Sequence, residues 1–380
     1  MMGFNGFELD EDLKAVRNLI RDFTDREIRP LAEQFDQENL YIPEELWRKM
    51  GRLGLFGFTI PEEFGGNHLG YLALAVAIEE VSKGAGVMYS PVAGQNGAFN
   101  GAIIDSGTPE QKQKYLPGTA EGRLKGAFAL TEPNVGSDAR GMQTVAALEG
   151  ECWIINGQKT FITNADRADY IITFAKTEEG TVCLIVDKDA KGLSIGATER
   201  KMGIHGVGLN NVFYTDCRVP VENQIGKVGE GFLNAKDSLM GARLGVAAGA
   251  LGLAQEAIDV AVEYAKQRVQ FGRPISQFQN TQFVLAECQT KLDAARLLTY
   301  RCAAALDAGK HETYMASMAK YYATETANQV ADKCLQVFGG YGYCAGYPIE
   351  RIYRDLRIFT IFDGTSEVHK MIISKKMGVR

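Results

Sequence analysis

The hydrophobic spacing of the 380-residue chain changes twice along its length, and this order restricts the fold more than any other feature. Apolar residues recur at helical spacing from Leu9 to Phe23 and in further short runs after it. From about Lys125 to Gly226, short runs rich in β-branched and aromatic residues replace them, and helical spacing returns after Gly231. The pattern predicts a helical, a β and a second helical domain, over residues 1–121, 122–230 and 231–380.

Two local patterns refine this order. The Asn156-Gly157 pair stands between Trp153–Ile155 and Phe161–Thr163, and it predicts a hairpin turn because both central residues of a type I′ turn need a positive φ. In the last domain, small residues dominate the segment Ala242–Ala250. This composition suggests close contact between helices, so the segment is expected inside a helical bundle.

Charge and histidine content exclude two classes of function. Lys and Arg total 41 against 47 Asp and Glu, a net charge of −6, so a nucleic acid partner is not expected. The four histidines are far apart and show no metal-ligand spacing, so no metal site is expected. They are His68, His205, His311 and His369.

The cysteines and the hydropathy of the chain indicate the compartment in which the protein is expected. The seven cysteines are odd in number and never form a C-x-x-C pair, which is typical of a reducing compartment such as the cytoplasm. The first residues turn acidic and amphipathic at once, unlike a targeting peptide. The longest uncharged stretch, Gly84–Ile104, contains Gln95, Asn96 and Asn100, which are costly in lipid. We therefore expect no membrane segment.

Nucleotide-binding and hydrolase motifs are absent or out of place. No G-x-G-x-x-G motif follows a predicted strand. Gly192–Gly196 matches the pattern G-x-S-x-G around Ser194, but no helix follows it to supply N–H groups for an oxyanion. A turn before a strand is the better interpretation, and a serine hydrolase using Ser194 is the alternative enzyme class.

A loop at the start of the β block, Leu130–Gly141, combines hydroxyl groups with free N–H groups. Thr131 and Ser137 supply the hydroxyls, and Gly136 and Ser137 supply the N–H groups. Such a loop is able to hold a polar heterocycle and a pyrophosphate. On composition alone, an ordinary acidic surface loop is the simpler interpretation.

Further motifs follow in a fixed order toward the C-terminus, and each is weak alone. They are Trp153–Asn164, Arg268–Gly272 with Phe278-Gln279, Gln336–Tyr343, Pro348–Asp355 and Ile361–Thr365. Together with the loop Leu130–Gly141, in this order and over nearly the whole chain, the set resembles the acyl-CoA dehydrogenase family of flavoenzymes.

The resemblance implies an α+β fold of the acyl-CoA dehydrogenase type, with an N-terminal all-α domain, a central β-barrel or sandwich domain and a C-terminal four-helix bundle. It also implies a homotetramer that binds FAD between domains and across a subunit boundary. The residues implied to line the flavin are Phe128, Leu130, Thr131, Gly136 and Ser137, with Phe161 and Thr163 on its other side. Those implied to reach the FAD of a neighbouring subunit are Arg268, Gln270, Phe278, Gln279, Gln336, Gly339 and Gly340. Those implied to meet its phosphate and adenine side are Thr365 and Glu367.

The implied chemistry is α,β-dehydrogenation of an acyl-CoA thioester, with electrons passed on to an electron-transfer flavoprotein. A carboxylate removes the α proton while the β hydrogen leaves as hydride to flavin N5. A flavin ribityl hydroxyl and the backbone N–H of the catalytic residue polarise the carbonyl. The implied substrate contacts are Ser137, Arg243 and Gly364.

The base position, usually a glutamate before Gly-Thr in this family, holds Asp363 here. The carboxylate of aspartate reaches roughly 1.5 Å less far at full extension. Three interpretations of Asp363 are open. It is the base for a closer or bulkier substrate such as cyclohexane-1-carboxyl-CoA, or a slower base for a straight acyl chain. In the third, it is a structural residue in a flavin-binding protein without dehydrogenase activity. The first two interpretations are favoured, with the alicyclic substrate as the specific hypothesis and a short or medium straight chain as the alternative.

Overall fold

The N-terminal region of the computed structural model, which describes residues 4–5 and 8–379, is mainly helical. Asp10 begins the first long helix by accepting a hydrogen bond from the N–H of Leu13 at 2.8 Å, and Thr108 and Gln111 form a capping box before the last one. The elements are β1 (Phe4–Asn5), β2 (Glu8–Leu9), α1 (Glu11–Phe23), α2 (Ala32–Gln37), α3 (Glu44–Arg52), α4 (Gly70–Gly84), α5 (Tyr89–Asn96), α6 (Gly101–Ser106) and α7 (Pro109–Ala120).

The middle region forms one eight-stranded sheet in the order β10-β7-β6-β4-β5-β9-β8, with β3 parallel to β6. One apolar cluster of this region surrounds Trp153, Ile155 and Val212, and another, around Tyr170 and Phe174, joins the sheet to α6 and α7. The strands are β3 (Gly126–Ala129), β4 (Val145–Glu149), β5 (Cys152–Thr163), β6 (Tyr170–Thr177), β7 (Gly180–Asp187), β8 (Leu193–Thr198), β9 (Leu209–Pro220) and β10 (Gln224–Ile225).

The expected hairpin turn at Asn156-Gly157 is wrong. Strand β5 continues through both residues, and its register against β9 shifts between Ile155 and Gly157 as in a β-bulge. Gly157 has φ +148°, and a Cβ there would lie 2.7 Å from the Cα of Thr144. The glycine is therefore required by a close approach inside the sheet. The chain reverses earlier, between β4 and β5, at Gly150 with φ +61°.

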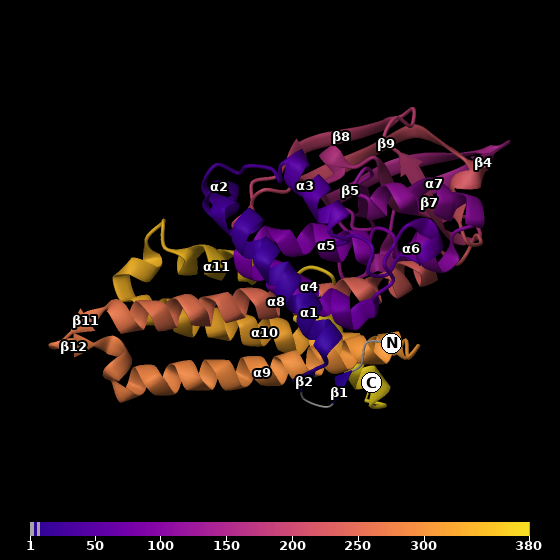
Figure 1. The fold of residues 1–380 in the computed structure, drawn as a ribbon. Coiled ribbons are helices and arrows are strands. Elements are labelled where there is room, and N and C mark those ends of the chain that lie inside the picture. Colours follow the sequence, from indigo (N-terminus) through magenta and orange to yellow (C-terminus); the bar gives the residue numbers. More distant parts are fainter. Residues whose placement is uncertain (1–3, 6–7, 380) are drawn as a thin grey trace.

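Three long helices dominate the C-terminal region and form an extended arm (Figure 1). The predicted close packing is confirmed, because a Cβ built at Gly245 would lie 2.6 Å from that of Ala93, and one at Gly252 would lie 2.1 Å from the carbonyl oxygen of Glu79. The helices are α8 (Gly231–Gln267), α9 (Gln279–Asp307), α10 (Thr313–Phe338), α11 (Pro348–Arg357) and α12 (Ser366–Lys376), and the short strands β11 (Val269–Gln270) and β12 (Arg273–Pro274) form the tip between α8 and α9. The predicted order of helical, β and helical regions is confirmed.

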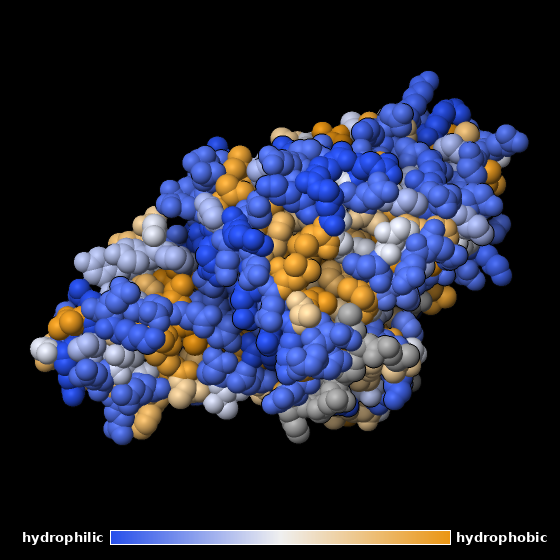
Figure 2. Space-filling view, viewed as in Figure 1, coloured by the Kyte–Doolittle hydropathy of each residue, from blue (hydrophilic) through white to orange (hydrophobic). Residues whose placement is uncertain are grey.

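The surface seen in Figure 2 is mostly hydrophilic, with an apolar area near its centre where α4 and α5 are labelled in Figure 1. Within the described residues, α8 alone is long and apolar enough to cross a membrane, but 78% of its most apolar window is buried inside the protein. This helix is therefore part of the core. All seven cysteines are free thiols.

Candidate active site

The turn between the 3₁₀ segment Ile358–Thr360 and helix α12 holds Asp363 in an uncommon backbone conformation. Asp363 has φ +51° and Gly364 has φ +101°, so two successive residues occupy the left-handed region. The hydroxyl oxygen of Thr365 then caps α12 by accepting from the N–H of Val368 at 3.3 Å. A non-glycine residue keeps such a conformation where its surroundings impose it, which marks this turn as a candidate functional element.

Buried side chains from three helices contact the backbone of this turn. Arg243 of α8 donates from Nε to the carbonyl of Asp363 at 3.3 Å, and Lys320 of α10 donates from Nζ to the carbonyl of Gly364 at 2.7 Å. Arg243 is 6% exposed, and Lys320 and His369 of α12 are fully buried. His369 packs against Gly364, because a Cβ on that glycine would lie 3.0 Å from Nε2. The fold thus brings the predicted base together with Arg243 and Gly364.

The charges around the turn act on one another. Burial raises the pKa of the Asp363 carboxyl above its usual range, while the positive charges of Lys320 and Arg243 oppose that rise. Burial lowers the pKa of Lys320 to about 8 and that of His369 to about 3, so His369 is a neutral imidazole at neutral pH. A carboxyl group whose pKa is set by burial and two cations is typical of a proton-transfer site.

Aromatic side chains close one side of the turn. Tyr89 of α5 is 8% exposed, and its ring centroid lies 4.8 Å from that of Phe359 and 5.6 Å from that of Phe362, the residue before Asp363. Burial and the charge of Asp363 both raise the pKa of Tyr89. The uncharged stretch predicted from the sequence therefore contributes an apolar wall beside the candidate base.

A buried ion pair braces the predicted flavin loop. Lys159 of β5 is fully buried and donates to the Glu132 carboxylate at 2.8 Å and to the Leu130 carbonyl at 3.1 Å. Glu132 also accepts from the backbone N–H groups of Gln143 and Thr144. Although burial acts in the opposite direction, Lys159 and these N–H groups lower the pKa of Glu132. The Glu132 carboxylate therefore links the start of the loop, through Lys159 and the Leu130 carbonyl, to the residues just after its end, Gln143 and Thr144.

The loop and the neighbouring strand fit a planar heterocycle with phosphate groups. Gly136 and Ser137 are exposed, and among the described residues their N–H groups donate no backbone hydrogen bond. Thr131 accepts from the N–H of Thr160 at 2.9 Å, which brings the loop beside Phe161, 60% exposed with φ +58°. An exposed aromatic ring and open N–H groups suit flavin and pyrophosphate. The other residues predicted on this side, Phe128, Leu130 and Thr163, are half-buried.

A second group of predicted cofactor residues surrounds a cleft of about 540 Å³ at the tip of the helical arm. The guanidinium carbon of Arg268 lies 5.4 Å from the ring centroid of Tyr341, and a Cβ at Gly339 or Gly340 would meet nothing within 4 Å. The cleft therefore has room for a ligand. The predicted residues that line it are Arg268, Gln270, Gln336, Gly339 and Gly340, whereas Phe278 and Gln279 lie at the adjacent start of α9.

The two groups of predicted cofactor residues do not meet within one chain. In Figure 1 the tip formed by β11 and β12 points away from the sheet and lies at the opposite end of the molecule. Both groups can therefore contact one FAD only if a second chain supplies one of them, and this sharing stays a prediction. Thr365 and Glu367 lie at the first turn of α12, where Thr365 caps the helix and Glu367 is exposed.

The described residues give no support to serine hydrolase or metal chemistry. Ser194 lies within strand β8 and pairs with Phe213 of β9, so it does not stand on a sharp turn between a strand and a helix. In the part of the chain that the structure describes, no group of three or more His, Cys, Asp or Glu side chains could hold a metal ion.

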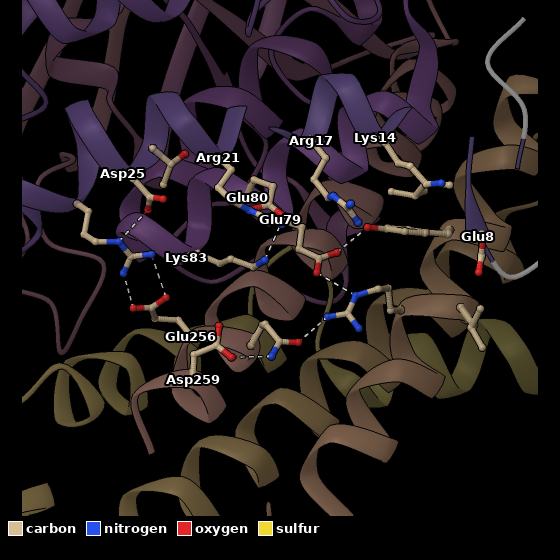
Figure 3. A pocket seen from close by; sticks show the side chains of 17 residues that line it. Glu8, Lys14, Arg17, Arg21, Asp25, Glu79, Glu80, Lys83, Glu256 and Asp259 are labelled. Carbon is tan, nitrogen blue, oxygen red and sulfur yellow. Dashed lines mark hydrogen bonds and ion pairs between the residues drawn. The ribbon is translucent and has the colours of Figure 1, made fainter. Parts of the chain in front are cut away.

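A larger cavity of about 820 Å³ lies elsewhere, among α1, α4, α8 and α9. Figure 3 shows its charged side chains pointing toward one another. Glu80 pairs with Arg21 and with Lys83, both at 3.0 Å, and Glu79 pairs with Arg296 at 2.9 Å. These ion pairs link α1, α4 and α9 across the cavity.

Sequence reasoning misses Lys320, although a signal for it is present. Ala316, Ala319, Ala323 and Ala327 are all buried and repeat at helical spacing, so they place Lys320 on the inner face of α10. A lysine on such a face is rare unless it has a partner. The spacing would therefore have identified a buried cation, but not the turn that it contacts.

Comparisons with known proteins agree with this geometry. The models for the N-terminal, middle and C-terminal domains of acyl-CoA dehydrogenase match residues 10–123, 127–217 and 229–378. A short-chain specific acyl-CoA dehydrogenase of Clostridium acetobutylicum is 41% identical over 98% of this chain and 99% of its own. The caffeyl-CoA reductase-Etf complex subunit CarC of Acetobacterium woodii is 42% identical over 96% of this chain and 97% of its own length. The solved butyryl-CoA dehydrogenase of Megasphaera elsdenii is 37% identical, with a TM-score of 0.93 over 98% and 99% of the two chains. The chain belongs to the acyl-CoA dehydrogenase family of FAD-dependent oxidoreductases.

Proposed function

We propose that the protein dehydrogenates short straight-chain acyl-CoA thioesters, with Asp363 as the base. The observation that carries this proposal is the turn of Asp363, which holds a partly buried carboxyl group beside two buried cations and an aromatic wall. By the family resemblance, this turn is where the base is expected.

Removal of an α proton requires a base that is both ionised and correctly placed. The positive charges of Lys320 and Arg243 favour the ionised form of Asp363, and their hydrogen bonds hold the turn that carries it. The N–H of Asp363 would donate to the thioester oxygen and stabilise the charge that develops there. The loop Leu130–Gly141 and Phe161 would hold FAD, which when bound would supply the acceptor for the β hydrogen as hydride.

The proposed substrate class rests on the relatives of the chain. The rings of Tyr89 and Phe362, with centroids 5.6 Å apart, supply an apolar surface beside the turn for an acyl chain. Two of the relatives described above are named for short-chain or butyryl substrates, and none of the three is named for an alicyclic one. We therefore replace cyclohexane-1-carboxyl-CoA by a short straight chain. Asp363 then acts with a shorter reach, and a misplacement of about 1 Å costs on the order of 10²-fold in rate.

A second candidate is the reverse reaction, reduction of an enoyl-CoA, because one relative is a subunit of a caffeyl-CoA reductase complex. The same residues serve it, since a protonated Asp363 would deliver the α proton. Burial raises the pKa of Asp363 and so favours the form that the reduction needs. The pH dependence separates the directions: as pH rises through the pKa of Asp363, dehydrogenation accelerates and reduction slows.

The proposed partners follow from the same observations. An electron-transfer flavoprotein is the proposed electron acceptor, because the name of the caffeyl-CoA reductase subunit places that protein in a complex with Etf. A homotetramer would bring the open cleft at the tip of one chain to the FAD of another. The seven free thiols support a reducing, cytoplasmic location.

Anaerobic titration with acyl-CoA compounds tests the proposal. The purified protein should show flavin absorption bands, and butyryl-CoA should bleach them faster than octanoyl-CoA or cyclohexanecarboxyl-CoA. Faster bleaching by the ring compound would restore the alicyclic hypothesis. If no compound in the panel bleaches the flavin, the protein binds FAD without dehydrogenase activity. Reoxidation of the reduced protein by crotonyl-CoA measures the reverse reaction.

A further inference from the structure

Lys320 has an unusual environment for a lysine. It lies on the inner face of α10 among alanines, is fully buried, and donates from Nζ to the carbonyl of Gly364 at 2.7 Å. No ion pair of the described residues joins it to a carboxylate within 4.0 Å. An ammonium group is costly to bury, so such a residue is retained where its charge has a use.

The turn above Lys320 needs an external support. Asp363 at φ +51° and Gly364 at φ +101° lie successively in the left-handed region, and the carbonyl of each is held by a buried cation. Glycine adopts a positive φ freely, whereas Asp363 pays a cost for it that persists when the surroundings fix the conformation. Lys320 acts on the residue directly after the base, so loss of this hydrogen bond would let the base shift.

We propose that Lys320 is a positioning residue, whose ammonium group holds the carbonyl of Gly364 so that the Asp363 carboxylate meets the α carbon of the substrate. The inference rests on the proposed function. The shorter reach of aspartate makes the position of the turn more critical, because a lost methylene leaves less freedom to recover a displacement.

The charge of Lys320 adds a second effect on the same base. The groups that share this charge cluster are Arg243 from α8, Tyr89 from α5, Glu325 from α10, and Asp363, Glu367 and His369 from the turn and α12. Lys320 and Arg243 favour the carboxylate form of Asp363, and neutral His369 adds no charge at neutral pH. Because burial lowers the pKa of Lys320 to about 8, its proton is lost within the working range of an enzyme assay.

Substitution Lys320→Met tests the inference in the FAD-loaded enzyme, because methionine keeps the length of the side chain without its charge. We expect flavin reduction by butyryl-CoA to slow by about 10²-fold, with little change in the concentration that gives the half-maximal rate. The wild-type rate should rise with pH as Asp363 ionises and fall again above about pH 8 as Lys320 loses its proton. K320M should lack the fall, and its rise should move to higher pH.

Lys83→Met is the matched control, since Lys83 is a largely buried lysine that pairs with Glu80 at 3.0 Å in the charged cavity. It should keep the wild-type rate and pH profile. A folded K320M enzyme that also keeps both would overturn the inference. Should K320M not fold, Lys320→Gln keeps a donor without the charge, so it should retain more of the rate but lack the fall above about pH 8, and an unchanged fall would overturn the inference. Failure of the wild-type flavin to bleach with any acyl-CoA would instead contradict the proposed function.

Discussion

The turn of Asp363 and the tip of the helical arm hold their predicted site residues in opposite ways. At the turn, buried Arg243 and Lys320 donate to successive carbonyls of the same chain. At the tip, Arg268 and Gly340 are exposed beside an open cleft. The turn is braced by contacts within one chain, whereas the cleft at the tip is open and lined by predicted cofactor residues. Substitutions should therefore separate chemistry from cofactor affinity.

Asp363→Asn should give the largest loss of flavin reduction rate without a change in FAD binding. Loss of the base is expected to slow flavin reduction by butyryl-CoA by about 10²- to 10⁴-fold, the usual contribution of acid–base catalysis. The FAD content should not change, because the predicted cofactor residues of the loop and tip are intact. Anaerobic stopped-flow absorbance measures the rate, and Ser194→Ala on β8 serves as a control with wild-type kinetics. Wild-type bleaching by D363N would remove Asp363 from the mechanism.

The predicted flavin loop, Leu130–Gly141, offers a second case, because buried Lys159 donates to it as Lys320 donates to the turn of Asp363. Lys159→Met leaves the Glu132 carboxylate, 4% exposed, without its cation. Removal of one partner from a buried ion pair typically costs about 3–5 kcal/mol. Urea denaturation should show a loss of that size, and the double variant K159M/E132Q should recover part of it because no charge then stays buried. Equal midpoints for K159M and wild type would show that the pair does not stabilise the fold.

The sequence predicts the large-scale order well and one local feature wrongly. Periodicity locates the helical and β regions because burial of one face of each element forces apolar residues to repeat. The same logic fails at Asn156-Gly157, where the positive φ of Gly157 belongs to a bulge inside β5 and not to a turn. The sequence shows that a glycine is present at position 157. The reason is that Thr144, the residue before β4, lies too close for a side chain at that position, and this contact cannot be seen in the local sequence.

The supports of the site could not be predicted, because they depend on contacts between distant elements. Asp363 and Arg243 are identified by motif, whereas Lys320 meets Gly364 only through the packing of α10 against α12. The pairing of Lys159 with Glu132 depends in the same way on how β5 meets the loop. Motifs thus indicate the candidate reacting groups, whereas tertiary packing decides which other side chains hold them in place.

Arg268→Ala should weaken FAD binding at the tip without changing the chemistry at the turn of Asp363. An exposed arginine that hydrogen-bonds a charged ligand contributes about 1.5–3 kcal/mol, so the affinity for FAD should fall by roughly 10- to 100-fold. Dialysis followed by FAD titration measures the affinity, and addition of excess FAD should restore the rate of flavin reduction. An unchanged affinity would separate this cleft from the cofactor.

Mixed assemblies sharpen the same comparison. If the tip of one chain completes the FAD site of another, unfolding and refolding R268A together with D363N should produce sites with an intact Asp363 from one chain and an intact Arg268 from its neighbour. Activity above the sum of the two separate variants, at limiting FAD, is then expected. If each chain used its own Arg268, mixing would add nothing.

Matched glycine substitutions give the smallest effects and compare the two backbones directly. Gly364→Ala places a Cβ 3.0 Å from Nε2 of His369 at φ +101°, and an L residue in such a conformation costs on the order of 1–3 kcal/mol. Gly340→Ala adds a Cβ that meets nothing within 4 Å, so its effect on the unfolding free energy should stay within about 0.5 kcal/mol. Urea denaturation of the two apoproteins measures the difference. If G364A is as stable as G340A, the turn does not depend on the positive φ of Gly364. Its backbone would then be flexible, and Lys320 alone would have to fix the position of the turn.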